Sequence, residues 1–68
     1  MSEETIKKIG AKLRDARQQK GLTQEEVAKS AGMGTTRYAV IERGQAKNIT
    51  INKLEKIAKV LDLSLFNI

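Results

Sequence analysis

Lysine and arginine are the side chains with the most chemistry to offer in this sequence of 68 residues. They number thirteen against eight aspartates and glutamates, which gives a formal net charge of +5 and a sequence pI near 9.8. A surplus of cations on so short a chain indicates a polyanionic partner such as nucleic acid. The same surplus can also serve only to keep the protein soluble. Charge alone therefore does not decide between a nucleic-acid partner and a role in solubility.

The residue types that most enzymes use as nucleophiles, bases and metal ligands are missing. There is no histidine and no cysteine, which excludes Ser-His-Asp and Cys-His systems and leaves no thiolate or imidazole for a metal. The adjacent carboxylates Glu3-Glu4 and Glu25-Glu26 point away from each other on a helix, and there is no glycine-rich phosphate loop. We therefore expect a protein that is not an enzyme and that uses no cofactor and no metal.

The length and the apolar content limit how the chain is organised. Sixty-eight residues make one domain at most, with a modest core and no disulfide to support it. No apolar run approaches the roughly 20 residues of a membrane span, and Met1-Ser2-Glu3-Glu4 lacks the apolar segment of a signal peptide. We expect one soluble, cytoplasmic domain over residues 1–68, with no membrane partner and no room for a small-molecule effector domain.

Apolar residues recur at spacings of three and four, which predicts a chain built from helices. The first helix runs from about residue 4 to 20, the second begins after Thr23, the third covers about 35–43, and the fourth follows Thr50. Their inward-facing residues are predicted to be Ile6, Ile9, Leu13, Ala16, Val27, Ala28, Ala31, Tyr38, Ile41, Ile51, Leu54, Ile57, Ala58 and Leu61. The tail, residues 63–68, is either a short fifth helix or a strand. The fold class is all-α, a compact bundle of four to five short helices.

Capping and turn residues mark the two middle helices most clearly. Thr23 and Glu26 have the spacing of a capping box. Gly21 and Gly32 suit the left-handed conformation that ends a helix. Two short helices joined by a glycine-containing turn form a helix-turn-helix, here over about residues 23–43, and the small Ala28 lets the two helices approach closely.

Five segments, in order over roughly residues 6–65, carry a resemblance to a known family. They are Leu13-Arg14-x-x-Arg17, the run from Lys20 to Ala28, Ala31-Gly32-Met33, Ile41-Glu42-Arg43-Gly44, and the run from Asn48 to Leu61. Together they resemble the phage-repressor and Cro-type helix-turn-helix proteins, also called the XRE family. The resemblance implies a lambda-repressor-like DNA-binding domain whose recognition helix, about residues 35–43, enters the major groove. In its short length and in the segment Asn48-Ile49-Thr50-Ile51, the chain is similar to controller proteins of restriction–modification systems.

The resemblance also implies which side chains contact DNA. Arg37 is the main base or phosphate reader, since its planar guanidinium can pair with guanine O6 and N7. Thr35 and Thr36 contact phosphates or base edges, or they only cap the helix, while Gln24 binds phosphate beside the amides that begin the second helix. The full set expected at DNA is Gln24, Thr35, Thr36, Arg37, Ala39, Val40, Arg43, Lys47 and Asn48.

The resemblance also bears on four positions that we expect to be structural. Arg17 and Glu42 are implied to form a partly buried ion pair that ties the first helix to the third. Tyr38 stands where the family usually has an aliphatic residue, so we expect its ring in the core first and at DNA second. Gly34 stands where a capping Ser, Thr or Asp is common, and either Gly34 or Thr35 caps the third helix.

We interpret the chain as a sequence-specific regulator of transcription that binds double-stranded DNA. A homodimer on a palindromic operator, regulating its own synthesis, is the expected form. The predicted dimer interface is the apolar tail, unless that tail folds back onto its own core; its residues are Leu63, Leu65, Phe66 and Ile68. The alternative is a protein-interaction module such as the antitoxin half of a toxin–antitoxin pair. The sequence does not distinguish repression from activation.

Overall fold

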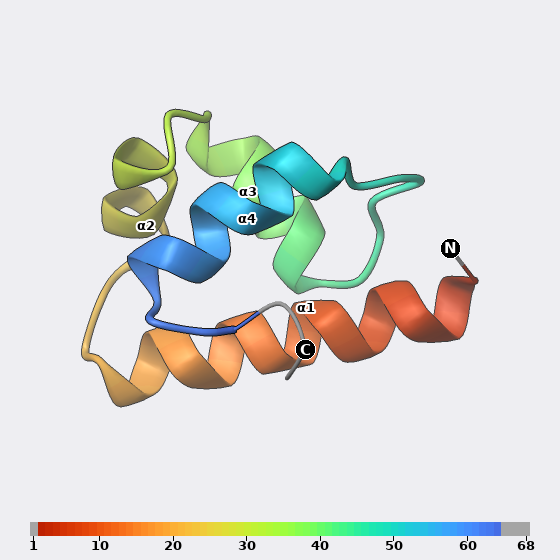
Figure 1. Cartoon of the computed structure of the whole chain (residues 1–68), viewed down its shortest axis with the longest axis horizontal. Helices are drawn as coiled ribbons and strands as arrows, with labels where there is room; N and C mark the ends of the chain where they lie inside the picture. Colours follow the sequence, from red (N-terminus) through yellow and green to blue (C-terminus); the bar gives the residue numbers. More distant parts are fainter. Residues whose placement is uncertain (1, 65–68) are drawn as a thin grey trace.

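The computed structural model describes residues 2–64, and all the regular structure in that range is helical. The helices are α1 (Glu3–Gln19), α2 (Gln24–Ser30), α3 (Thr35–Glu42) and α4 (Ile51–Val60). The long α1 runs along one side, and the three shorter helices gather on the other (Figure 1). The predicted all-α class is confirmed. Within the described range no helix is long and apolar enough to cross a membrane.

The core takes one large, fully buried side chain from each helix. These are Leu13 of α1, Val27 of α2, Tyr38 of α3 and Ile57 of α4. Burying such a side chain contributes about 1.5–3 kcal/mol. All four belong to one buried cluster, which holds the four helices together. The prediction that the ring of Tyr38 lies in the core is confirmed.

Hydroxyl caps fix where three of the helices begin. The side chains of Ser2, Thr23 and Thr50 each accept a backbone N–H from the first turn of the helix that follows. The predicted capping box is present, because Thr23 Oγ1 accepts the Glu26 N–H at 3.0 Å and Glu26 Oε1 accepts the Thr23 N–H at 2.9 Å. The backbone N–H of Thr23, and next to it the Thr23 hydroxyl, hold the pKa of the Glu26 carboxyl below its ordinary value.

Ile51 was expected on the inner face of α4, and this expectation is wrong, since the residue is 68% exposed. It is the first residue of α4, and its neighbours Thr50 and Asn52 are exposed as well. The first turn of α4 therefore projects beyond the core, and the buried stripe begins only with Leu54. A regular spacing gives the phase of the apolar face, but it does not say where the facing helices end.

The chain beyond α4 closes onto the core as far as Leu63. Asp62 adopts a φ of +57°, and its carboxylate accepts a hydrogen bond from Lys20 Nζ at 2.6 Å. The Leu63 N–H donates to the Ala58 carbonyl at 2.8 Å, and the Leu63 side chain is partly buried against the core. The other residues expected at a dimer interface, Leu65, Phe66 and Ile68, lie outside the described residues.

The start of α3 offers a site for stabilisation, because its cap residue, Gly34, has no side chain to accept a hydrogen bond. The backbone there (φ −73°, ψ 147°) suits any residue, and an added Cβ would meet no atom within 4 Å. We expect Gly34→Ser to raise the free energy of unfolding by about 0.5–1 kcal/mol, by adding a cap and reducing the freedom of the unfolded chain.

Thermal unfolding followed by circular dichroism measures this effect, which corresponds to a rise of several degrees in Tm. Gly34→Ala is the matched control, because it stiffens the unfolded chain equally but supplies no hydroxyl. An alanine variant as stable as the serine variant would contradict the capping explanation.

Candidate nucleic-acid interface

The turn between α2 and α3 sets the angle at which α3 meets the surface. Ala31 ends α2 and Gly32 follows with a φ of +72°, a left-handed conformation that glycine adopts at little cost. The Met33 N–H then closes the turn by donating to the Ala28 carbonyl at 2.9 Å. Ala28 is fully buried, which is consistent with the close approach of the two helices expected from its small size.

The first turn of α3 carries the exposed side chains of this helix. Thr35, Thr36 and Arg37 are exposed, whereas Ala39 and Val40 are half-buried at the edges. The side of α3 that faces the core is formed by Tyr38 and by the two residues after Val40, both buried. All five residues of α3 expected at DNA therefore have accessible surface, and the most accessible ones lie at its N-terminal end.

A buried network fixes the other end of α3 to α1. Arg17 donates from Nε to Glu42 Oε2 at 2.7 Å and from Nη2 to Oε1 at 3.0 Å. Its third donor, Nη1, reaches the Leu22 carbonyl at 2.9 Å. The ion pair expected between Arg17 and Glu42 is thus present in the structure, in the bidentate geometry that makes such pairs strong.

Gln24 belongs to this network as well, which the sequence did not indicate. Its Nε2 donates to Glu42 Oε1 at 3.1 Å, and the residue is half-buried. The hydrogen bond uses one of the two N–H groups of the amide and fixes its orientation at the start of α2. The expected contact of Gln24 with phosphate would have to be made by the second N–H group.

Opposing influences act on the pKa of Glu42. Burial by itself raises the pKa of this carboxyl, but the hydrogen bond from Arg17, the contacts with Tyr38 and Gln24 and the charge of Arg17 together hold it below its ordinary value. A carboxyl whose pKa is lowered by folding stabilises the protein above its unfolded pKa. That stability is lost as the pH falls through the folded pKa.

We therefore expect Glu42→Gln, which keeps the shape but cannot ionise, to flatten the dependence of stability on acid pH. The wild-type protein should lose stability as the pH falls below about 4.5, whereas the variant should be less stable at neutral pH and lose less. Urea denaturation from pH 7 to pH 2 measures both curves. Some acid dependence should remain through the capping carboxyl of Glu26, and identical slopes would contradict the role of Glu42.

The Tyr38 hydroxyl lies beside this network but lacks a hydrogen-bond partner in the part of the chain that the structure describes. It is inaccessible to water, and among residues 2–64 none is in position to form a hydrogen bond of good geometry with it. Burial raises the pKa of this hydroxyl, and the nearby carboxylate of Glu42 raises it further. The group therefore stays neutral, and its desolvation is poorly compensated.

We expect Tyr38→Phe to leave the free energy of unfolding unchanged or to raise it by up to about 1 kcal/mol, since it removes a buried polar atom and keeps the ring. Denaturation in urea measures the change. Tyr38→Leu is the control, because it also removes ring volume and should destabilise by more than 1 kcal/mol. A phenylalanine variant that loses as much as the leucine variant would show that the hydroxyl is well paired.

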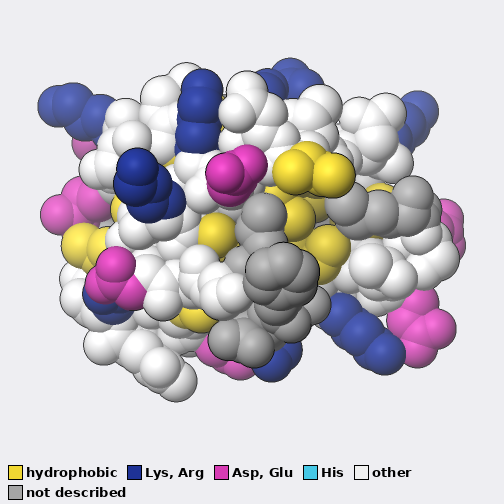
Figure 2. Space-filling model, viewed as in Figure 1, with side chains coloured by type: hydrophobic (Ala, Val, Ile, Leu, Met, Phe, Trp, Pro, Cys, Tyr) yellow, Lys and Arg dark blue, Asp and Glu magenta, His cyan; other side chains and the backbone are white. Residues whose placement is uncertain are grey.

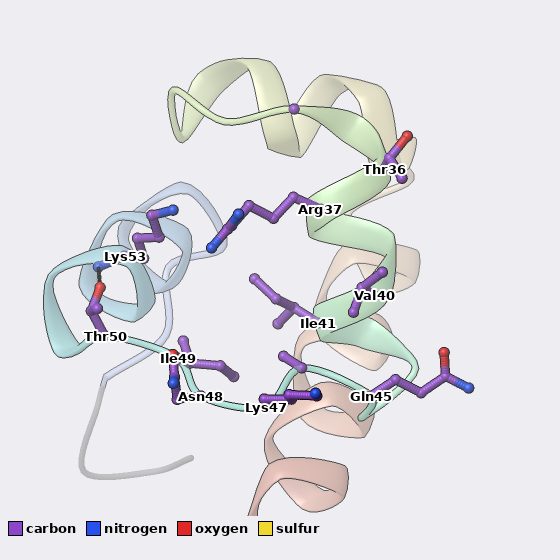
Figure 3. Close-up of a pocket in the computed structure, with 12 residues that line it drawn as sticks. Thr36, Arg37, Val40, Ile41, Gln45, Lys47, Asn48, Ile49, Thr50 and Lys53 are labelled. Atoms are coloured by element: carbon purple, nitrogen blue, oxygen red, sulfur yellow. Dashed lines mark hydrogen bonds between the residues drawn. The ribbon is translucent and has the colours of Figure 1, made fainter.

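A groove lies between α3 and the start of α4, and the loop that joins the two helices closes one end of it (Figure 3). Five of the residues expected at DNA line this groove: Thr36, Arg37, Val40, Lys47 and Asn48. Its floor is apolar and comes from Ile41 and Ile49. Of the others, Gln24 lies in the buried network, and Arg43 lines a separate cleft against α1, where its Nε donates to Gln45 Oε1 at 3.3 Å.

The helix-turn-helix geometry agrees with the comparison of the sequence with known families. A family model named HTH_3, described as helix-turn-helix, matches residues 13–67. The chain belongs to the HTH_3 family. The resemblance to repressor-type helix-turn-helix proteins noted from the sequence is therefore confirmed.

Named relatives and a solved structure agree with this membership. The chain is 38% identical over 56 residues to the HTH-type transcriptional regulator SinR of Bacillus subtilis (strain 168), which covers 82% of the chain and 50% of SinR. It is 41% identical over 59 residues to the ImmF control region 10 kDa protein of Bacillus phage phi105, covering 87% of the chain and 64% of that protein. The chain thus spans about half to two thirds of these curated relatives.

The solved structure is that of the restriction-modification controller protein C.AhdI from Aeromonas hydrophila. It matches with a TM-score of 0.83 and 34% sequence identity, over 90% of this chain and 91% of that one. Nearly the whole helical arrangement is therefore shared between the two proteins.

Two polar residues near the start of α4 also line this groove, although they were not among those expected at DNA. Lys53 and Thr50, both near the start of α4, line it opposite α3. Lys53 is half-buried, whereas Lys56 and Lys59 on the same helix are exposed. The available signal was its position three residues after the cap Thr50, in the first turn, which adjoins the loop.

Proposed function

We propose that this HTH_3 domain binds double-stranded DNA sequence-specifically and regulates transcription, with α3 in the major groove. The observation that carries the proposal is that Thr36, Arg37, Lys47 and Asn48 all line one groove beside the exposed end of α3. In helix-turn-helix complexes the N-terminal residues of the second helix face the base edges. The regulatory names of SinR and C.AhdI support the same function.

Charge supplies the non-specific part of the binding in this proposal. A formal charge of +5 favours association with the phosphate backbone and makes the affinity fall with salt. Lys47 and Asn48 extend the groove beyond α3, so they would follow the backbone while α3 faces the bases. Contacts to phosphate position the protein, and contacts to base edges give it sequence preference.

The active form in this proposal is a homodimer on a palindromic operator. Two symmetry-related copies place their recognition helices about one helical turn of DNA apart. Hydrophobic side chains gather near the middle of the face that carries α4 (Figure 2), and Ile51 is a large apolar residue exposed within the described range. Both features favour a protein partner. Occupancy of the operator would follow the concentration of the protein, which suits a protein that regulates its own synthesis. Because it would act on DNA, the place proposed for the protein is the cytoplasm.

A selection from random double-stranded oligonucleotides, with the bound sites sequenced, tests the function. A palindromic consensus with half-sites about ten base pairs apart would support a dimeric regulator, and sedimentation of the protein with and without that site would give the stoichiometry. Binding that shows no enriched sequence and vanishes with salt would overturn the proposal. The search would then turn to a protein partner, as in an antitoxin.

A further inference from the structure

We propose that Arg37 and Lys53 hold one phosphate of the DNA backbone between them, across the groove that separates α3 from the start of α4. Arg37 is then a backbone contact, and it does not read a base. This inference rests on the proposed function and refines it, because it says which side chains position the protein and which remain for the sequence.

The direction of the Arg37 side chain is the first observation. The side chain leaves α3 and extends across the groove, with its guanidinium on the side where Lys53 lies (Figure 3). Thr36 points to the opposite side of α3 in the same view (Figure 3). The arginine therefore reaches away from the surface that its neighbour presents, and toward α4.

The charge of the groove is the second observation. Arg37, Lys47 and Lys53 line it, and no aspartate or glutamate is among its described lining residues. The ion pairs found within residues 2–64 use other cations, namely Lys8, Arg17 and Lys20. Like charges facing one groove repel one another, and the attraction of each cation to an anion bound between them offsets that repulsion.

The chemistry of the two cations indicates a phosphate rather than a base. Arginine binds phosphate through a planar fork, and lysine binds it as a point charge. A guanine edge would satisfy the fork of Arg37, but it carries no net charge to neutralise Lys53. With a volume of about 690 Å³ the groove has room for a hydrated sugar-phosphate segment.

The backbone around Lys53 is fixed by a hydrogen bond at the start of α4. The Lys53 N–H donates to the cap hydroxyl of Thr50 at 3.2 Å, so the first turn of α4 is closed by a hydrogen bond. Lys53 itself is half-buried along the groove wall, which limits the freedom it must lose on binding. Reading of the bases then falls to Thr36 and Val40, whose methyl groups suit the methyl of thymine.

The test uses the full chain and the operator recovered by selection, together with a scrambled duplex of equal length. Affinities of wild-type protein, Arg37→Ala, Lys53→Ala and the double variant are measured by fluorescence anisotropy over a range of salt. Lys56→Ala is the matched control, because Lys56 lies on α4 but is exposed and outside the groove. Circular dichroism checks that every variant is folded.

Each single variant should bind both duplexes about tenfold more weakly, lower the salt slope by about one unit, and leave the ratio of the two affinities unchanged. The double variant should lose less than the product of the two single losses, because both side chains bind the same phosphate. Single phosphates can also be replaced by neutral methylphosphonates. We expect one position at which this replacement weakens DNA binding by the wild-type protein but not by either single variant.

Two outcomes would overturn the inference while leaving the proposed function intact. In the first, Arg37→Ala relaxes the preference at one base pair, which would make Arg37 a base reader. In the second, Lys53→Ala behaves like Lys56→Ala, so that the groove does not hold the backbone. A selection that recovers no preferred site for the wild-type protein would instead overturn the proposed function itself.

Discussion

Glu42→Ala is expected to lower the free energy of unfolding by about 3–5 kcal/mol, because it leaves a largely buried arginine without its carboxylate. The Glu42 side chain is 1% exposed and that of Arg17 is 14% exposed. Two hydrogen bonds from Arg17 and one from Gln24 lose their acceptor at once. For a domain of this size such a loss is a large part of the total stability, so DNA binding should be lost through unfolding.

Urea denaturation followed by circular dichroism measures the loss, and Glu42→Gln separates its two causes. The glutamine keeps an oxygen to accept hydrogen bonds but carries no charge, so we expect it to lose less than the alanine. Glu55→Ala is the control for removing an exposed carboxyl elsewhere and should change the free energy of unfolding by less than about 0.5 kcal/mol. Unchanged stability in Glu42→Ala would contradict the structural role of the pair.

The parts of the fold that were predicted correctly depend on local signals. The capping hydroxyl and carboxylate of Thr23 and Glu26 mark the start of α2 within four residues of sequence, and the structure contains both hydrogen bonds. Gly21 and Gly32 were expected to be left-handed at helix ends, and they have φ values of +68° and +72°. Such features need no knowledge of the rest of the chain.

The parts that were missed depend on how distant segments meet. Ile51 fits the apolar spacing of α4, yet no periodicity shows that the first turn extends beyond the core. The partner of the Gln24 amide is Glu42, eighteen residues away. The groove that contains Arg37 and Lys53 exists only because the loop after α3 brings the start of α4 alongside it. Side-chain directions of this kind follow from tertiary packing, not from local propensity.

The position of α3 in this domain depends on α1, which is not part of the helix-turn-helix itself. Two features join α1 to the C-terminal end of α3. One is the ion pair of Arg17 with Glu42. The other is a close backbone approach at Gly10, where an added Cβ would lie 2.5 Å from the Ile41 carbonyl oxygen and 2.6 Å from that of Glu42. We expect a change in either feature to displace the C-terminal end of α3.

Gly10→Ala tests the second of these features, and we expect it to destabilise the protein although alanine is the better helix former. Inside a helix that exchange normally gains about 1 kcal/mol. Here the new methyl group would overlap two backbone oxygens, which cannot move aside as the end of a flexible side chain can. Overpacking typically costs about 1–3 kcal/mol, and contacts this short belong at the upper end, so we expect a net loss of about 2 kcal/mol.

Denaturation in urea measures the change, and Ala11→Gly on the same helix is the matched control. Ala11 is exposed, so its replacement by glycine should show only the helix-propensity cost of about 1 kcal/mol. The two substitutions are chemical opposites, and propensity alone predicts opposite signs for them. If both destabilise, the contact between α1 and α3 determines the result at Gly10. A more stable Gly10→Ala variant would mean that α1 and α3 are further apart than described.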